Sequence, residues 1–67
     1  MAPSNAEGEL QEQGRLAEAI ALYDEALRLD PQNAEFYNNR GLAYFDLGQP
    51  QRAIQDYDEA LRLDPQN

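Results

Sequence analysis

The sequence predicts an all-α protein built from antiparallel helix–turn–helix hairpins, and three observations support this fold class. The first is an internal repeat: residues 24–33 and 58–67 both read DEALRLDPQN, at an offset of 34 residues. Duplication or design explains such identity, and a period of this length fits one helical hairpin. The second is composition, because helix-favouring Ala, Leu, Glu, Gln and Arg dominate between the helix breakers. The third is the helical spacing of the apolar residues.

The first helix is predicted at about residues 4–13. Ser4 followed by Glu7 fits a capping box, in which each side chain accepts a hydrogen bond from a free backbone N–H group. Gly14 closes the helix, because glycine takes the left-handed conformation at a helix end without a steric cost.

The second helix is predicted at about residues 16–29. Its apolar residues follow a period of 3.6, and they are Leu16, Ala19, Ile20, Tyr23, Ala26 and Leu27. Leu22 and Leu29 widen this stripe, which predicts contacts on more than one side. Pro31 ends the helix because the residue before a proline is disfavoured in the helical region. Asn33 is suited to cap the next helix.

The third and fourth helices are predicted at about residues 34–47 and 50–63. The main apolar stripe of the third helix consists of Tyr37, Gly41, Tyr44 and Phe45. Gly41 inside a helix costs about 1 kcal/mol relative to alanine, which predicts that another backbone or a large ring approaches it closely. Gly48, Gln49 and Pro50 form the turn, with Pro50 in the first turn of the fourth helix.

The fourth helix repeats the apolar pattern of the second, and the two also share a charge pattern. Asp24 with Arg28, and Asp58 with Arg62, are spaced four residues apart with the acid first. This arrangement predicts two surface ion pairs that each contribute a few tenths of a kcal/mol.

Residues 34–67 carry a pattern that resembles the tetratricopeptide repeat family. The matching residues are Tyr37, Arg40-Gly41, Tyr44, Ala53, Tyr57 and Pro65, where the family pattern has Trp, Leu-Gly, Tyr, Ala, Phe and Pro. Tyrosine replaces Trp and Phe, and Arg40 replaces an apolar residue. The resemblance implies a fragment of an α-solenoid, a single domain over residues 1–67, with repeat 2 at residues 34–67.

Repeat 1, about residues 1–33, matches only in its second half. Its first helix is degenerate and offers little more than Ala6 and Leu10 to bury. A direct offset places Glu7 opposite the glycine of repeat 2, whereas a one-residue gap places Gly8 there, and both alignments stay open.

The resemblance implies a non-catalytic module for protein–protein interaction. Arrays of this family commonly end with an extra polar helix, and fewer than three repeats fall below the usual requirement for independent stability. The chain reaches Asn67 without such a helix. We therefore expect a homo-oligomer, as a dimer, a head-to-tail stack or a product of helix exchange, with a marginal monomer as the alternative.

The alternative function is a peptide-binding scaffold fragment. The family binds peptides on the concave face lined by the first helix of each repeat, which corresponds here to residues 34–46. The candidate binding residues are Glu35, Asn38, Asn39, Leu42, Phe45 and Asp46. Leu42 and Phe45 either hold an apolar ligand side chain or pack against the neighbouring hairpin. An acidic groove favours a basic or neutral peptide, and without lysine we expect no clamp for a peptide carboxylate.

Composition excludes most other function classes. The 67 residues carry 13 acids and five arginines, with a net charge of −8, and they lack lysine, histidine and cysteine. Disulfides and thiolate metal sites are excluded, and the charge disfavours nucleic acid and anionic membranes as partners. The acidic side chains either form a solvated helix surface or attract a basic partner.

The sequence predicts no enzyme, no cofactor and no metal site. Histidine, cysteine and lysine are missing among the side chains that usually serve in acid–base catalysis, and Ser4 is the only serine. Asp56, Asp58 and Asp64 lack the glycine that a calcium loop needs. No apolar run approaches the roughly 18 residues of a membrane span, and the N-terminus lacks the features of a signal peptide. We expect a soluble, cytoplasmic protein, and an excised or designed fragment has the same features.

Overall fold

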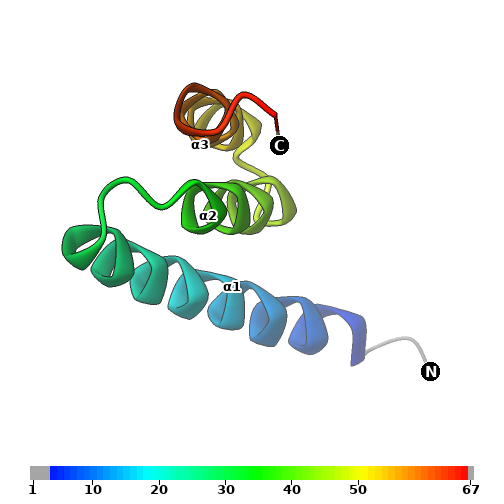
Figure 1. The fold of residues 1–67 in the computed structure, drawn as a ribbon. Helices are drawn as coiled ribbons and strands as arrows, with labels where there is room; N and C mark the ends of the chain where they lie inside the picture. Colours follow the sequence, from blue (N-terminus) through cyan, green and yellow to red (C-terminus); the bar gives the residue numbers. More distant parts are fainter. Residues whose placement is uncertain (1–3, 67) are drawn as a thin grey trace.

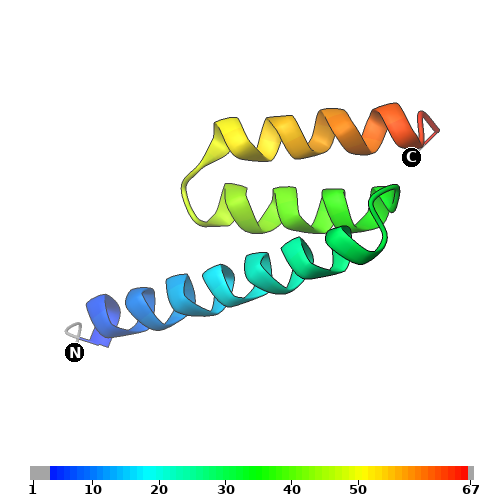
Figure 2. The ribbon, with the colours of Figure 1, turned by 90° about the vertical axis from the view of Figure 1, so that its left-hand side faces the viewer.

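Three α-helices pack in chain order. The computed structural model describes the backbone of residues 4–66 and the side chains of residues 12–66. The helices are α1 (Ser4–Leu29), α2 (Ala34–Asp46) and α3 (Pro50–Leu63). Helix α2 lies between the other two (Figure 1) and packs against both, whereas α1 and α3 do not contact each other within the described residues. Figure 2 shows α2 and α3 as an antiparallel hairpin, from which the N-terminal part of α1 diverges. The all-α hairpin architecture is confirmed.

The prediction of four helices is wrong. The expected helices at 4–13 and 16–29 form the single helix α1. In the α2–α3 turn, Gly48 has a φ of 87° and Pro50 follows at the start of α3. The corresponding residues of repeat 1 are Gly14, Arg15 and Leu16, without a proline, so nothing blocks continued helix. The residues before Gly14 also have few apolar side chains, so folding them back onto the rest of α1 would bury little apolar surface.

Local sequence signals set the boundaries between the helices. Helix α1 ends at Leu29, two residues before Pro31, as expected. Asn33 caps α2 as expected, because its Oδ1 accepts a hydrogen bond of 3.0 Å from the backbone N–H of Phe36. Helix α2 ends at Asp46, one residue earlier than expected. The side chains of Ser4 and Glu7, the expected capping box of α1, lie outside the described residues.

The α2–α3 contact is close because α2 carries a glycine at its centre. A Cβ atom added to Gly41 would lie 2.8 Å from Cε1 of Tyr57 and 3.2 Å from the carbonyl oxygen of Ala53. The expectation that a ring or a backbone approaches Gly41 is confirmed, and here both do. Ala53 and Ala60 of α3 are almost fully buried at the same contact. Small side chains thus allow the two helices to pack tightly.

Candidate functional site

The six predicted binding residues all lie along α2. Five of them are exposed and Asn38 is partly buried. Their spacing of three and four residues places them in one stripe along the helix, which we call the α2 stripe. Its residues are Glu35, Asn38, Asn39, Leu42, Phe45 and Asp46. Because α1 and α3 occupy other sides of α2, the stripe is accessible along the length of that helix.

Leu42 and Phe45 are the apolar members of the α2 stripe. Their side chains are 53% and 59% exposed, so neither packs into the described hairpin. Phe45 therefore does not belong to the packed stripe in which its spacing predicted it. Tyr37 and Tyr44 do lie partly buried, and Phe36 joins them in the packing, with its ring 6.4 Å from that of Tyr23 on α1. Two exposed apolar side chains one helical turn apart, flanked by carboxylates, suit an apolar ligand group with basic neighbours.

The packed side of α2 centres on Arg40, which joins all three helices. Its Nε and Nη2 donate to both carboxylate oxygens of Asp56 on α3, at 2.9 and 2.8 Å. Its Nη1 donates to Oδ1 of Asp24 on α1, at 2.7 Å. Asp56 is only 5% exposed, so this bidentate pair satisfies a carboxylate inside the helix contact. We call these three residues the Arg40 cluster.

The surroundings of Arg40 favour its charged form. The hydrogen bonds to Asp56 raise the pKa of the guanidinium above its ordinary value, with a smaller contribution from Asp24 and against the effect of burial. Its Cζ also lies 5.4 Å from the ring centroid of Tyr37 and 5.9 Å from that of Tyr44. Sequence reasoning noted Arg40 only as a departure from an apolar position. An arginine that is partly buried at a helix contact needs carboxylate partners, and its place at a usually apolar position was the signal that could have indicated them.

The two ion pairs predicted at a spacing of four residues are wrong. Arg28 pairs with Glu25 and Arg62 pairs with Glu59, each at a spacing of three. Asp24 is instead used by the Arg40 cluster. The tertiary contact therefore takes the carboxylate that the local rule had assigned to Arg28.

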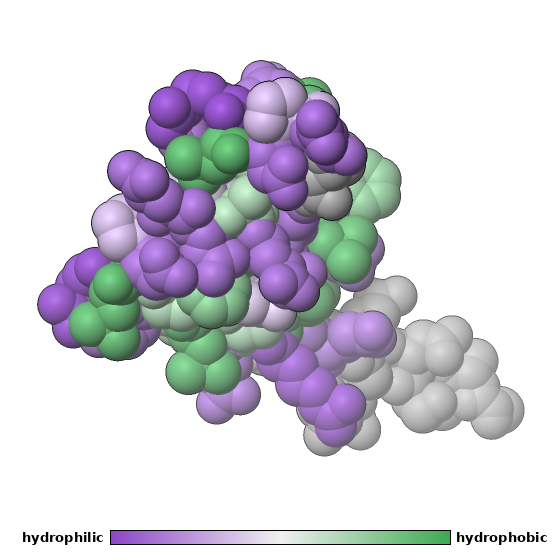
Figure 3. Space-filling view, in the orientation of Figure 1, coloured by the Kyte–Doolittle hydropathy of each residue, from purple (hydrophilic) through white to green (hydrophobic). Residues whose placement is uncertain are grey.

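Apolar side chains also reach the surface at both ends of the helix stack, over α3 and over α1 (Figure 3). On α3, Ile54 is 56% exposed and Leu61 is 50% exposed. Together with Asp58 they lie at spacings of four and three residues, and we call these three residues the outer face of α3. On α1, Leu22 and Leu29 are each 71% exposed. The expectation that they contact neighbours on a second side is wrong, because among the described helices α1 contacts α2 alone.

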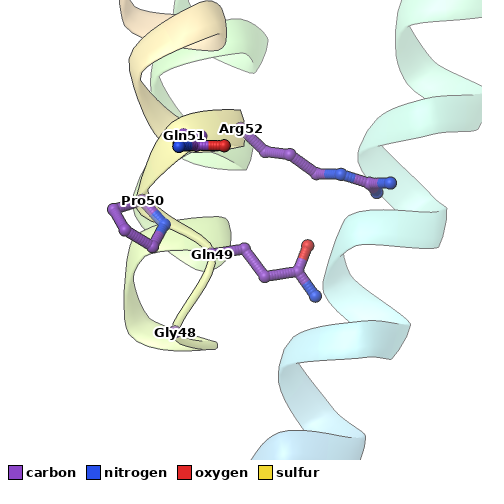
Figure 4. Close-up of a pocket in the computed structure, with 5 residues that line it drawn as sticks. All are labelled: Gly48, Gln49, Pro50, Gln51 and Arg52. Atoms are coloured by element: carbon purple, nitrogen blue, oxygen red, sulfur yellow. The ribbon is translucent and has the colours of Figure 1, made fainter.

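An open hollow lies at the α2–α3 turn. It is lined by Gly48, Gln49, Pro50, Gln51 and Arg52. Figure 4 shows the side chains of Gln49 and Arg52 extending toward α1. Arg52 also lies over the ring of Tyr44, with Cζ 5.6 Å from the centroid. The lining of the hollow thus includes the side-chain N–H donors of Gln49, Gln51 and Arg52.

The structure gives no support to metal chemistry or to a membrane span in the part of the chain that it describes. Among those residues no three His, Cys, Asp or Glu side chains gather as a metal site would need. None of the described helices has the length and apolar character needed to cross a membrane. Of the three acids considered for calcium, Asp56 is already held by Arg40.

Comparisons with known proteins match this helical pattern. A family model described as "TPR repeat" matches residues 9–48, and one described as "Tetratricopeptide repeat" matches residues 34–67. The second range coincides with the second copy of the 34-residue period. The chain is also 53% identical over 30 residues to "Outer envelope protein 64, chloroplastic" of Arabidopsis thaliana, a stretch covering 45% of this chain and 5% of that protein. The chain thus spans a small part of this curated relative.

Proposed function

The chain belongs to the tetratricopeptide repeat family, and we propose that it is a non-catalytic interaction module that associates with further copies of itself through its exposed helix faces. One observation carries this proposal. Ile54 and Leu61 on α3 are at least half exposed, although Ile20 and Leu27, at the same positions of the repeat in α1, are 8% and 7% exposed under α2. The outer face of α3 thus has the chemistry of a helix contact, but none of the described helices packs upon it.

Burial of this face gives a reason for association. Fully burying an isoleucine or leucine side chain contributes about 1.5–3 kcal/mol each. A small helical domain is only marginally stable alone, so covering the outer face of α3 stabilises the fold as well as the assembly.

Molar mass measured by light scattering across a concentration series tests the proposal. We expect the weight-average mass to rise above 7.6 kDa as the protein concentration increases. Circular dichroism at the same concentrations should show unfolding that shifts to higher temperature with concentration, because association stabilises the folded state. A constant monomer mass up to millimolar protein, with a melting temperature that does not depend on concentration, contradicts self-association.

The exposed side chains of Leu42 and Phe45 favour a second function, peptide binding on the α2 stripe. Glu35 and Asp46 flank them, so the partner that we propose is a peptide with alternating basic and apolar residues. A short fluorescent peptide of alternating lysine and leucine is the probe, followed by anisotropy. The double variant Leu42→Ala with Phe45→Ala should lose binding.

The matched control is the double variant Leu22→Ala with Leu29→Ala, which removes two exposed leucines from another helix. It should keep the affinity of the wild type for the peptide. Equal loss in both double variants would show only non-specific attraction between an acidic chain and a basic probe, and would remove the α2 stripe as a binding site.

A further inference from the structure

Two helices of this chain present the same residues in the same arrangement. The sequence identity between residues 24–33 and 58–67 extends to a face of α1 and a face of α3. The pairs of identical residues are Ile20 and Ile54, Asp24 and Asp58, and Leu27 and Leu61. The first member of each pair lies on α1 and the second belongs to the outer face of α3.

In α1 the chain itself shows what binds this face. Helix α2 covers it, so that Ile20 and Leu27 are buried. Asp24 accepts a hydrogen bond from Arg40 of α2. An aromatic residue one turn earlier, Phe36, packs beside the ring of Tyr23. A helix with an aromatic residue and an arginine four positions later is therefore complementary to this face.

In α3 the same face is exposed. Within the described residues no helix covers Ile54 and Leu61, and Asp58 makes no ion pair there. Its carboxylate is thus available to the partner that Asp24 already has. Both the apolar surface and the charge point to the same occupant, a helix with the residues of α2.

We propose that the outer face of α3 binds α2 of a second copy, in place of that copy's own α1, with Arg40 of the incoming helix donating to Asp58. This proposal rests on the self-association proposed above and names its interface. The incoming α2–α3 hairpin in turn presents its own outer face of α3, so the contact is heterologous and copies join head to tail. Each exchange replaces a contact to Ile20, Asp24 and Leu27 by one to the same three residue types.

The short linker between α1 and α2 determines the conditions under which exchange is favoured. Residues 30–33 tether α2 to its own α1, which gives α1 an effective concentration of about millimolar in competition with any second copy. Exchange is therefore favoured by high protein concentration and by any change that weakens the contact between α1 and α2. A rigid stack, in which the outer face of α3 meets the exposed leucines of another copy's α1, requires no such weakening.

The same substitution at two matched positions separates these mechanisms. Asp58→Asn removes the carboxylate charge that would pair with an incoming Arg40 and should lower the association constant about threefold, as expected for a partly exposed ion pair. Asp24→Asn weakens the contact that α2 must leave, and should raise the association constant about threefold. Both constants are measured by sedimentation equilibrium of the full chain, with helix content checked by circular dichroism.

An apolar pair of variants extends the test. Leu61→Gln should lower the association constant about tenfold or more, because it removes the burial of an apolar side chain. Leu22→Gln changes a more accessible leucine, on α1, and should leave the constant unchanged. Neither side chain belongs to the buried core of the monomer, so both substitutions leave that core intact.

The outcomes separate failure of the exchange from failure of self-association. If Asp24→Asn weakens or does not affect association, or if Leu22→Gln weakens it as much as Leu61→Gln, copies stack through preformed faces and the exchange is wrong while self-association stands. If the wild-type chain is monomeric throughout, both proposals are wrong. Opposite effects of the two asparagine variants support the exchange.

Discussion

Replacing Gly41 by alanine tests how closely α2 and α3 approach each other. A Cβ atom at this position would lie 2.8 Å from Cε1 and 3.0 Å from Cδ1 of Tyr57. It would also lie 3.2 Å from the carbonyl oxygen of Ala53, which belongs to the backbone of α3 and cannot rotate away. The added methyl group therefore forces the two helices apart or the tyrosine ring out of its position.

Two opposing effects set the size of the change. Alanine is favoured over glycine in a helix by about 1 kcal/mol, whereas overpacking a tight contact costs about 1–3 kcal/mol. The ring of Tyr57 is partly accessible and can yield, but the backbone of Ala53 cannot. We expect Gly41→Ala to reduce the free energy of unfolding by about 1–2 kcal/mol, taking the steric cost from the upper part of that range.

Two other glycines provide matched controls. An added Cβ at Gly14, inside α1, meets nothing within 4 Å, so Gly14→Ala should raise stability by up to about 1 kcal/mol. Gly48 has a φ of 87°, which L residues rarely adopt, so Gly48→Ala should lower stability by about 1–2 kcal/mol. The same chemical change is thus expected to have opposite signs at positions of different geometry.

Thermal unfolding followed by far-ultraviolet circular dichroism measures all three variants. A change of 1 kcal/mol shifts the melting temperature of a domain this small by about 4–8 °C. The comparison requires one protein concentration, since association changes the apparent stability. Stabilisation by Gly41→Ala would refute the close α2–α3 contact. Destabilisation by Gly14→Ala would refute the continuous α1 and indicate the turn that the sequence had predicted there.

Three further changes test the Arg40 cluster, the α2 cap and the surface pairs. Arg40→Met leaves Asp56 buried without its partner and should lower the free energy of unfolding by about 2–3 kcal/mol, less than for a fully buried pair because Arg40 is partly exposed. Denaturant unfolding measures this loss, and adding Asp56→Leu should recover much of it. Asn33→Ala removes the acceptor of the Phe36 N–H and should cost about 1 kcal/mol, whereas Gln32→Ala beside it should have little effect in the same assay. The pKa of the Glu25 and Glu59 carboxyls lies below the ordinary value because Arg28 and Arg62 donate hydrogen bonds to them, so this stabilisation is present above the unfolded-state pKa and is lost as the pH falls through the folded-state pKa. Carbon-13 NMR titration should show both carboxyls returning toward the ordinary pKa in Arg28→Gln and Arg62→Gln, and unchanged titration curves would contradict the pairing.

The α2 stripe shows what the spacing of apolar residues along a helix can predict and what it cannot. Spacing along the third predicted helix placed Leu42 and Phe45 near one another, and the structure shows them exposed on α2. The same spacing assigned Phe45 to the packed stripe and overlooked Phe36, which contacts α1. Periodicity identifies which residues share a side of a helix, but the width of the packed side depends on where the neighbouring helices lie.

The sequence by itself determined the features that depend on neighbouring residues. Pro31 ends α1, Asn33 caps α2, and Gly48 with Pro50 makes the turn into α3. Each of these effects acts within one turn of helix, so local residue types are sufficient. The need for small residues at Gly41 could also be predicted, because a glycine inside a helix is costly without a packing reason.

Only the tertiary structure decided whether repeat 1 forms a hairpin and which charges pair. Gly14 permits either a turn or a continuous helix, and the outcome depends on the apolar surface that folding back would bury. Arg40 has partners 16 residues away in both directions along the chain, on two different helices. The pair with Asp56 forms because packing removes water from that carboxylate and makes a strong hydrogen-bond partner necessary. A rule based on spacing within one helix cannot predict these partners, because they come together only when three helices pack.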